Sequence, residues 1–453
     1  MSMFQIGLSG LKSTQTALEV TSNNISNSST SGFKAGSTEF AAVYNGGQRG
    51  GVKVADIKED FTATGDLVKT DKDLDLAITG KGFFVLSANG REAYTQAGQF
   101  GLNDQLYITN ASGAKLQGYG VDDATDPNIV PGVLTDLKIE GSNIPAQASD
   151  LVTFSGNFSS ASDVIPYPTA PDTFDPTDGS AYNFSQSTEV FDSLGNSHVL
   201  TQYYNHTGSN EWQTMYFVDG QPLTATQLGL PGGATVGSQN VTVDGATTAA
   251  GAVTITFGTD GQMLPLDGSF TPGTVPDSNS TDPYSMRQVQ LTFSPLDKDG
   301  NPNGAGDVSL TIDMKQSTQF GSGFAMYNND ANGYTSGEFN GVTVDADGKL
   351  YATFTNGESK LQGQLVLATF ANVNGLEQGD NTVWYNTAES GNPLYTTADS
   401  GTVGQLLSGQ YMGSNVDISD QLVDLISFQQ NYQANAKTIS TANDMMQVLF
   451  NAT

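Results

Sequence analysis

The chain has 453 residues, with 17 Lys and Arg against 47 Asp and Glu, which gives a formal net charge of −30. A chain this acidic offers no basic stripe to neutralise phosphates, which argues against nucleic acid and against an anionic membrane surface as partners. It contains no cysteine, which excludes disulfides, thiolate catalysis and cysteine-ligated metals. Its length predicts roughly two to four domains.

The first residues predict an amphipathic helix. Ser2 and Gln5 form a capping box at its start, and the polar stretch 23–32 ends it. Spacings of four and three residues place one stripe on a single face. The positions of this stripe are Phe4, Leu8, Leu11, Gln15, Leu18, Ser22 and Ile25. We expect no secretory signal here, since residues 1–11 have no basic segment and their apolar residues are spaced apart.

The middle of the chain is rich in strand and turn patterns. Residues 31–70 are expected to form an extended connector. Residues 71–145 and 321–414 have similar strand and turn patterns, and the sequence Lys-Leu-Gln-Gly at 115–118 recurs at 360–363. These two segments are predicted to form one inner β domain. Residues 146–320 are predicted to be an outer β domain inserted into it, with long polar loops between short strands. Strand candidates in these regions are 74–78, 83–86, 107–109, 151–154, 199–204, 212–218, 253–257, 289–293 and 308–312.

The last residues repeat the helical pattern of the first. Asp417 is placed to cap a helix that runs to the chain end, with Asp420 in its first turn. Its stripe comprises Ile418, Leu422, Leu425, Gln429, Tyr432, Ala436, Ile439, Asn443, Met446 and Phe450. Neither terminal stripe is expected to find a partner surface within its own subunit. Both stripes are therefore expected to be buried against other copies of the chain. The residues predicted to carry self-assembly are Phe4, Leu8, Leu11, Leu18, Ile25, Ile418, Leu422, Leu425, Tyr432, Ile439, Met446 and Phe450.

The residues offer little for catalysis. The two histidines, His198 and His206, lie outside any metal-spaced cluster and are expected to be ordinary polar residues. Residues 7–10 are one residue short of a nucleophile elbow and lie on a helix, and no phosphate-binding glycine loop occurs. Asp71, Asp73 and Asp75 alternate on a strand, but this is a poor calcium cage. We therefore predict no enzyme, no cofactor and no metal site.

Five phrases of the sequence resemble the rod and hook axial proteins of the bacterial flagellum. They are Gly7-Leu8-Ser9-Gly10-Leu11, Val20-Thr21-Ser22-Asn23-Asn24-Ile25-Ser26-Asn27, Thr30-Ser31-Gly32-Phe33-Lys34, the run 74–84 with Gly80 and Gly82-Phe83-Phe84, and Tyr432-Gln433-Ala434-Asn435-Ala436-Lys437-Thr438-Ile439-Ser440-Thr441. Residues 94–100 and 191–198 also resemble the family. Gln430 departs from it, because the family often has Arg there. Length favours the hook subunits within this family.

The resemblance implies a mainly β fold with terminal α-helices and nested, discontinuous domains. The N- and C-terminal helices (1–30 and 415–453) would form a coiled-coil-like polymer core, with two β domains outside. It implies a structural subunit that self-assembles into a tubular, flexible joint and transmits torque from rod to filament. The implied partners are copies of the chain, the rod, the hook cap, the hook–filament junction proteins and the flagellar type III export apparatus. The implied location is the extracellular flagellar hook, reached without a cleaved signal peptide.

Three alternatives remain open on the sequence. The chain could be a distal rod or hook-associated axial protein, which would form straight polymers. It could be an acidic extracellular β-rich adhesin, which would leave the terminal stripes unexplained. A glycan-active enzyme would need a carboxylate pair facing a cleft, and no pair is nominated among the 47 acids.

Overall fold

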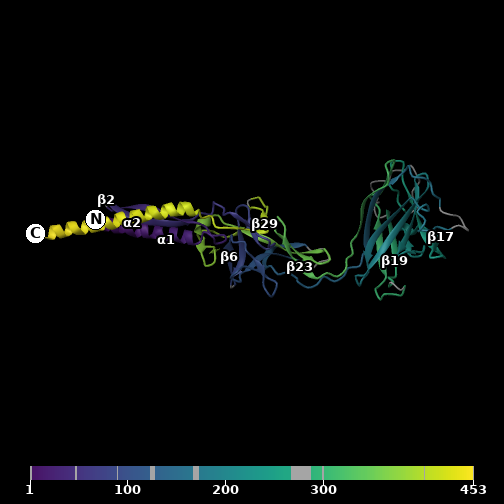
Figure 1. Cartoon of the computed structure of the whole chain (residues 1–453), viewed down its shortest axis with the longest axis horizontal. Helices are drawn as coiled ribbons and strands as arrows, with labels where there is room; N and C mark the ends of the chain where they lie inside the picture. The colour runs from purple at the N-terminus through teal and green to yellow at the C-terminus, as the bar shows by residue number, and fades with distance from the viewer. Residues whose placement is uncertain are drawn as a thin grey trace. The chain divides into compact units, whose positions relative to one another are not determined.

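A computed structural model of the chain describes residues 3–45, 48–88, 90–122, 128–166, 173–266, 287–297, 300–401 and 403–451. The chain divides into two compact units (Figure 1). Unit 1 comprises Met1–Ser142, Phe339–Thr353 and Ser359–Thr453, and unit 2 comprises Asn143–Glu338 and Phe354–Glu358. Unit 2 is therefore an insertion between segments that fold together.

Unit 1 contains both terminal helices, a hairpin and a β body. The helices are α1 (Met3–Ser26) and α2 (Ile418–Asn451). The hairpin is β1 (Gly36–Asn45) with β2 (Gln48–Glu59). The body contains β3 (Leu67–Lys69), β4 (Leu76–Ile78), β5 (Phe83–Ala88), β6 (Arg91–Thr95), β7 (Gly101–Leu102), β8 (Ile108–Thr109), β9 (Lys115–Val121), β10 (Ile129–Asp136), β23 (Phe339–Val344), β24 (Lys349–Phe354), β25 (Ser359–Thr369), β26 (Glu377–Gln378), β27 (Val383–Tyr385), β28 (Leu394–Thr397), β29 (Leu406–Ser408) and β30 (Gln410–Met412).

The sheet of unit 1 joins segments from both sides of the insertion. Its main strand order is β23-β24-β25-β9-β5-β6-β27-β26, and β3 pairs with β30 near the chain ends. The two Lys-Leu-Gln-Gly echoes lie on the neighbouring strands β9 and β25, where Leu365 pairs with Gly118. A Cβ at Gly118 would lie 2.3 Å from the carbonyl oxygen of Gln364, so the close approach of these strands requires glycine.

Aromatic residues build the core of the β body. Phe83, Tyr94 and Trp384 are buried together with Val85 and Ala368. The ring of Phe61 lies edge-on to Trp384, with centroids 5.4 Å apart. Aromatic pairs in this geometry contribute beyond the area that they bury, and Phe61 ties the end of the hairpin to the body.

Unit 2 has two six-stranded sheets that share one core. One sheet has the order β16-β19-β20-β11-β21 with β22 on β11, and the other has the order β12-β13-β14-β18-β17 with β15 on β14. Buried side chains from both sheets meet, including Phe154, Phe158, Tyr204, Trp212 and Leu310. The strands are β11 (Leu151–Ser159), β12 (Phe184–Phe191), β13 (Ser197–Gly208), β14 (Glu211–Val218), β15 (Gln221–Pro222), β16 (Leu228–Gly229), β17 (Gly237–Val243), β18 (Ala246–Thr256), β19 (Gln288–Phe293), β20 (Val308–Asp313), β21 (Thr318–Phe320) and β22 (Ala325–Ala331).

The chain is mainly β with a helix at each end, as the sequence predicts, and each strand candidate overlaps an observed strand. The predicted cap of α2 is confirmed, because Asp417 Oδ1 accepts hydrogen bonds from the backbone N–H groups of Ser419 and Asp420. Ser2, the predicted cap of α1, lies outside the described residues.

Two expectations about boundaries differ from the structure. Residues 31–70 are not an extended connector, because 36–59 form the antiparallel hairpin β1–β2. The inserted unit does not end at 320, because the polar strand β22 pairs with β11 and unit 2 continues to Glu338.

Candidate assembly surface

The buried face of α1 consists of small and polar residues. Glycine, serine, threonine, alanine and asparagine repeat there at spacings of three and four residues. These buried residues are Gly7, Gly10, Ser13, Thr14, Ala17, Thr21 and Asn24. Small side chains let neighbouring backbones approach closely, so this face is suited to packing inside the subunit.

The two helices run antiparallel and meet along this small-residue face. A Cβ built at Gly7 would lie 2.9 Å from Cγ1 of Ile439, and one built at Gly10 would lie 2.7 Å from Oδ1 of Asn435. At the other end, Nδ2 of Asn24 donates a hydrogen bond to Oε1 of Gln421 at 2.8 Å. Glycine at these two positions therefore leaves room for the side chains of Ile439 and Asn435 on α2.

The hairpin covers another part of α1. The backbone N–H of Val52 donates to Oγ of Ser9 at 3.2 Å, and Oγ of Ser13 donates to the carbonyl of Val52 at 3.4 Å. Asn24 also exchanges hydrogen bonds with the backbone of Gly36 through both atoms of its amide. These polar contacts hold the first helix against β1 and β2.

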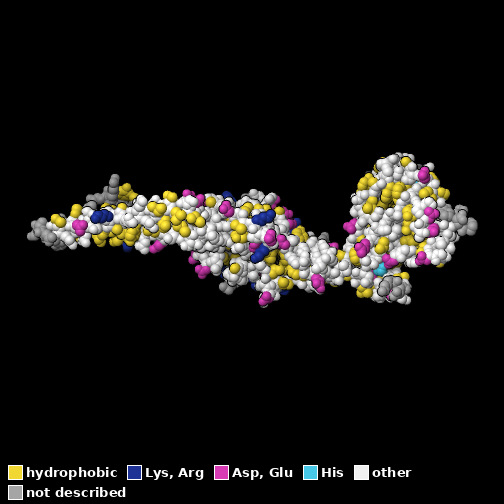
Figure 2. All heavy atoms as spheres, viewed as in Figure 1, with side chains coloured by type: hydrophobic (Ala, Val, Ile, Leu, Met, Phe, Trp, Pro, Cys, Tyr) yellow, Lys and Arg dark blue, Asp and Glu magenta, His cyan; other side chains and the backbone are white. Residues whose placement is uncertain are grey.

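The apolar stripe of α1 lies one residue beyond the small-residue face and stays uncovered. One residue corresponds to a rotation of about 100° around a helix. Phe4 is 45% exposed, Leu8 is also exposed, and Leu11, Leu18 and Ile25 are half-buried. Figure 2 shows hydrophobic side chains gathered along the helical end of unit 1. Contiguous exposed apolar surface of this kind marks an interaction site.

Helix α2 has an inner and an outer side. The inner side includes Leu425, Phe428 and Ile439, which are half-buried in the subunit. On the outer side, Leu422 is 46% and Ile426 is 54% exposed. Exposed apolar residues on α2 are Ile418, Leu422, Val423, Ile426, Tyr432, Met445, Met446 and Val448.

The predicted self-assembly residues thus divide into two groups. Six of the twelve are exposed, namely Phe4, Leu8, Ile418, Leu422, Tyr432 and Met446. The others are half-buried within the subunit, namely Leu11, Leu18, Ile25, Leu425 and Ile439. Of these, Ile439 directly contacts α1 in the same chain. The side chain of Phe450 lies outside the described part of the chain.

A buried lysine lies where the hairpin meets the start of α2. Nζ of Lys34 donates to the carbonyl of Ala63 at 3.0 Å and contacts Sδ of Met412 at 3.7 Å. Asn415 joins the same point, because its Oδ1 accepts from the backbone N–H of Ala35 and its Nδ2 donates to the carbonyl of Asp60. This junction fixes residues from both chain ends to each other.

The charges at this junction are perturbed by burial. Burial lowers the pKa of Lys34 to about 8, although Asp60 and Glu59 oppose the shift. Burial likewise raises the pKa of Glu59, against the hydrogen bond that Trp384 Nε1 donates to its Oε2 at 2.6 Å. Both shifts follow from the cost of holding a charge away from water. Sequence patterns give no sign of this buried charge.

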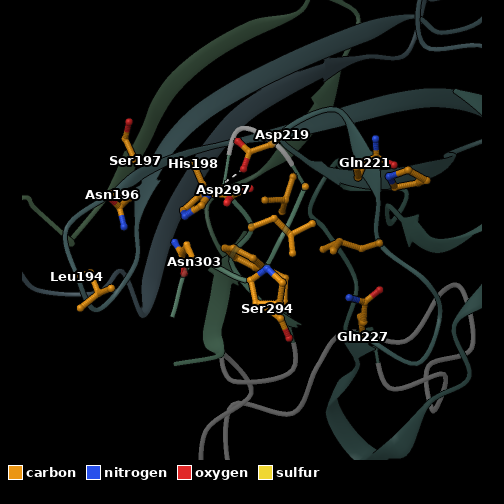
Figure 3. A pocket seen from close by; sticks show the side chains of 17 residues that line it. Leu194, Asn196, Ser197, His198, Asp219, Gln221, Gln227, Ser294, Asp297 and Asn303 are labelled. Carbon is orange, nitrogen blue, oxygen red and sulfur yellow. Dashed lines mark hydrogen bonds and ion pairs between the residues drawn. The ribbon is translucent and has the colours of Figure 1, made fainter. Parts of the chain in front are cut away.

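Unit 2 carries a polar pocket of about 1020 Å³ (Figure 3). Its wall includes the buried His198, whose Nδ1 lies 2.6 Å from Oδ2 of Asp219 and whose Nε2 lies 3.4 Å from Oδ2 of Asp192. Burial acts to raise the pKa of Asp192, but hydrogen bonds from Asn196, Asn303 and the backbone of Leu194 outweigh it and hold that pKa at about 2. These side chains satisfy each other and join the turn at 192–196 to neighbouring strands, which is a structural role.

The described residues show no group of three or more His, Cys, Asp or Glu placed to hold a metal ion. Among them, no helix has the length and apolar character needed to cross a membrane. His206 stacks on Trp212, with ring centroids 4.8 Å apart, and its Nδ1 lies 2.9 Å from the carbonyl oxygen of Ser162.

Four family models match successive parts of the chain. Flagella basal body rod protein matches residues 4–34, and the flagellar hook protein FlgE/F/G D1 domain matches 77–157. The flagellar basal body protein FlaE D2 domain matches 157–334, and the flagellar basal body rod FlgEFG protein C-terminal model matches 408–452.

Curated relatives match the chain over nearly its whole length. The flagellar hook proteins FlgE of Escherichia coli (strain K12) and of Salmonella typhimurium are each 34% identical over 453 residues, covering 99% of this chain and 99% of theirs. The flagellar hook protein FlgE of Rhizobium meliloti is 28% identical, covering 98% of this chain and 97% of its own. The crystal structure of Helicobacter pylori flagellar hook protein FlgE2 aligns with a TM-score of 0.46 and 12% identity, covering 75% of this chain and 98% of that one.

Proposed function

Because the chain belongs to the flagellar hook protein family, whose members are structural subunits of the hook, we propose that its terminal helices drive self-assembly. The observation that carries the proposal is the uncovered apolar surface of α1 and α2, formed by residues such as Phe4, Leu422 and Ile426. The small-residue face already satisfies packing within the subunit. The apolar surface remains available for neighbouring copies, whose contact would remove it from water.

The parts of the chain divide the work. The terminal helical segments 1–30 and 415–453 form the wall that holds the tube together. The β body of unit 1 lies outside that wall in the tube, and unit 2, the inserted unit of residues 143–338 and 354–358, forms the outer layer. The hairpin and the Lys34–Asn415 junction connect helices to β body within one subunit, so a load on one is passed to the other.

The outer layer is suited to weak, reversible lateral contacts. The sequence of unit 2 contains three basic residues, Arg287, Lys298 and Lys315, among many acids. Like charges on neighbouring copies repel each other, and salt screens that repulsion over about 10 Å at 0.1 M. Neighbouring outer units can therefore shift against each other at small energetic cost, which allows a curved tube to transmit torque while it rotates.

The subunit acts mechanically and not as a catalyst. In the unit 2 pocket, Asn196 and Asn303 donate hydrogen bonds to Asp192, and His198 contacts Asp219, which supports a structural role for His198. The partners are other copies of the chain, the rod, the hook cap, the hook–filament junction proteins and the type III export apparatus. The location is the extracellular hook.

Incubation of the purified chain, followed by pelleting and negative-stain electron microscopy, tests the proposal. We expect tubes from the full chain and none from a variant without residues 1–26, with the β units of that variant still folded by circular dichroism. Monomers under all assembly conditions, or tubes that form equally well without α1, would contradict it. Straight tubes from the full chain would favour a distal-rod role.

A further inference from the structure

A crevice opens where α1, the β1–β2 hairpin and α2 meet. Its volume is about 520 Å³, which is within the range of about 300–1,000 Å³ for pockets that enclose small ligands. None of the described residues that line it is charged. The lining includes Ile6, Gly10, Phe40, Val52, Phe428 and Ala434. This crevice is distinct from the outer apolar side of the helices because it lies between three elements.

The shape of the crevice follows from its residues. Phe40 and Phe428 form one wall, with ring centroids 6.5 Å apart in an edge-to-face arrangement. Gly10, Gly51 and Ala434, which carry little or no side chain, also line it, together with the polar residues Ser13, Thr14, Asn431 and Asn435. The exposed apolar side chains of Ile6 and Phe40 in this crevice are poorly served by water.

The same molecule carries a protruding segment at the end of α2 whose described apolar side chains are exposed. Helix α2 has 34 residues and α1 has 24. Since Gly7 faces Ile439 in the antiparallel pair, residues 444–451 extend past the start of α1 by about 12 Å at 1.5 Å per residue. Figure 1 shows the C-terminal end of α2 reaching beyond α1. We name residues 444–451 the α2 tip.

The side chains of the α2 tip match the crevice in chemistry. Met445 is 52%, Met446 is 57% and Val448 is 68% exposed. Asp444 is the one charged residue in the sequence of this tip. Methionine side chains are flexible and fill irregular apolar gaps, and the centres of interfaces are depleted of charge.

The tip cannot fill the crevice of its own chain. Ala434 and Met446 are twelve residues apart on one continuous helix, which separates them by about 18 Å. We infer that the crevice receives the α2 tip of a second copy of the chain. The inference rests on the proposed function, since it assumes a polymer, and it assigns a specific head-to-tail contact within that polymer.

The geometry of this contact suits a tube. The crevice and the tip are different patches, so their association is heterologous, and a pair of joined copies keeps one free crevice and one free tip. Repetition of such a contact gives a ring or an open helical array, and a closed symmetric dimer does not result. The contact therefore supplies axial growth, while the outer apolar side of the helices remains for lateral neighbours.

Cysteine chemistry tests the contact cleanly, because the chain contains no cysteine. The double variant Ala434→Cys/Met446→Cys is assembled, treated with a short bis-maleimide and examined by denaturing gel. The matched control is Gln433→Cys/Met446→Cys, since Gln433 is exposed beside Ala434 but points about 100° away around the helix. We expect a ladder of covalent multimers from the first pair in tubes, and loss of that ladder both in the control pair and in monomer.

Tubes of the first pair without a ladder, or with the same ladder as the control, would overturn the inference. Should the double variant form no tubes, a photoreactive benzoyl-phenylalanine at position 434 is doped as a minor component into isotopically labelled wild-type polymer. A cross-linked labelled peptide from residues 444–451 would support the contact, and a labelled peptide from elsewhere would overturn it. Failure of the wild-type chain to form tubes would instead refute the proposed function, together with this inference.

Discussion

Replacement of Leu422 by Asp separates assembly from folding. Leu422 is 46% exposed and lies on the outer side of α2, so its substitution is expected to change subunit stability by no more than about 0.5 kcal/mol. Under the proposed function the same position is buried against a neighbour in the tube, and an uncompensated carboxylate there would cost roughly 3–5 kcal/mol. Since 1.4 kcal/mol is a factor of ten in an equilibrium constant, the critical concentration for assembly should rise by about two to four powers of ten.

The assay compares pelleted and soluble protein over a concentration series, with thermal unfolding of the soluble subunit as the check on folding. Leu422→Met keeps the position apolar and should assemble as wild type. Ser427→Asp adds the same charge at an exposed position that is already polar, and should have a much smaller effect. Assembly of Leu422→Asp at the wild-type critical concentration would show that this side of α2 faces solvent in the polymer.

Three further outcomes are expected. Because the pKa of Lys34 is about 8 when folded and 10.5 when unperturbed, wild-type stability should rise with pH between these values. Lys34→Met should therefore be more stable than wild type near pH 7 by roughly 3 kcal/mol, and this difference should largely disappear by about pH 10.5. Urea unfolding at both pH values measures the difference, and an equal difference at both would refute the buried charge. Asp192→Asn should destabilise unit 2 by about 1.5–3 kcal/mol, as expected for lost hydrogen bonds to a charge. The stability difference between wild type and variant should be present above pH 3.8 and disappear as pH falls through about 2. Measurements of unfolding over an acid pH series would show this loss. Deletion of residues 143–338, with a short Gly/Ser linker in their place, should leave a chain that still forms tubes, and electron micrographs should show these tubes to be straight or irregular. A deletion variant that folds but does not assemble would show that unit 2 is needed for assembly.

The terminal helices show what hydropathy patterns can and cannot predict. Large apolar residues such as Phe4 and Leu422 form visible stripes, so both helices and their exposed side could be predicted. The face that pairs α1 with α2 uses Gly7, Gly10 and Asn435, which carry no hydropathy signal. The available signal was the repeat of small residues at spacings of three and four. This signal is found by examining the size of the side chains and not their hydrophobicity.

The β regions likewise contain some elements that the sequence predicts and others that it does not. Alternating strands bounded by turns, such as β19 with its alternating burial, are predictable because one face is buried. The β1–β2 hairpin packs on α1 through a face that is only half-buried, so its hydropathy signal is weak, although Asn45 followed by Gly46 is a common hairpin turn signal. Strand β22 contains Asn328, Asn329 and Asp330 and resembles a loop, because its pairing with β11 comes from tertiary contacts.

The buried polar groups could not be predicted from local sequence. Lys34 follows a polar turn, and nothing near it in sequence indicates that Ala63 and Met412 enclose its ammonium group. His198 and Asp192 lie in a recognisable turn region, but Asn303 completes the network from more than a hundred residues away. Such sites depend on long-range packing, which neither composition nor spacing records.

A high-resolution electron cryo-microscopy reconstruction of tubes assembled from the purified chain tests the central claim most directly. The account predicts that residues 3–26 and 418–451 form the innermost layer, and that Phe4, Leu422 and Ile426 lie within about 4.5 Å of side chains from neighbouring copies. Tubes in which these three side chains face solvent, with subunits held together only through the β units, would contradict it.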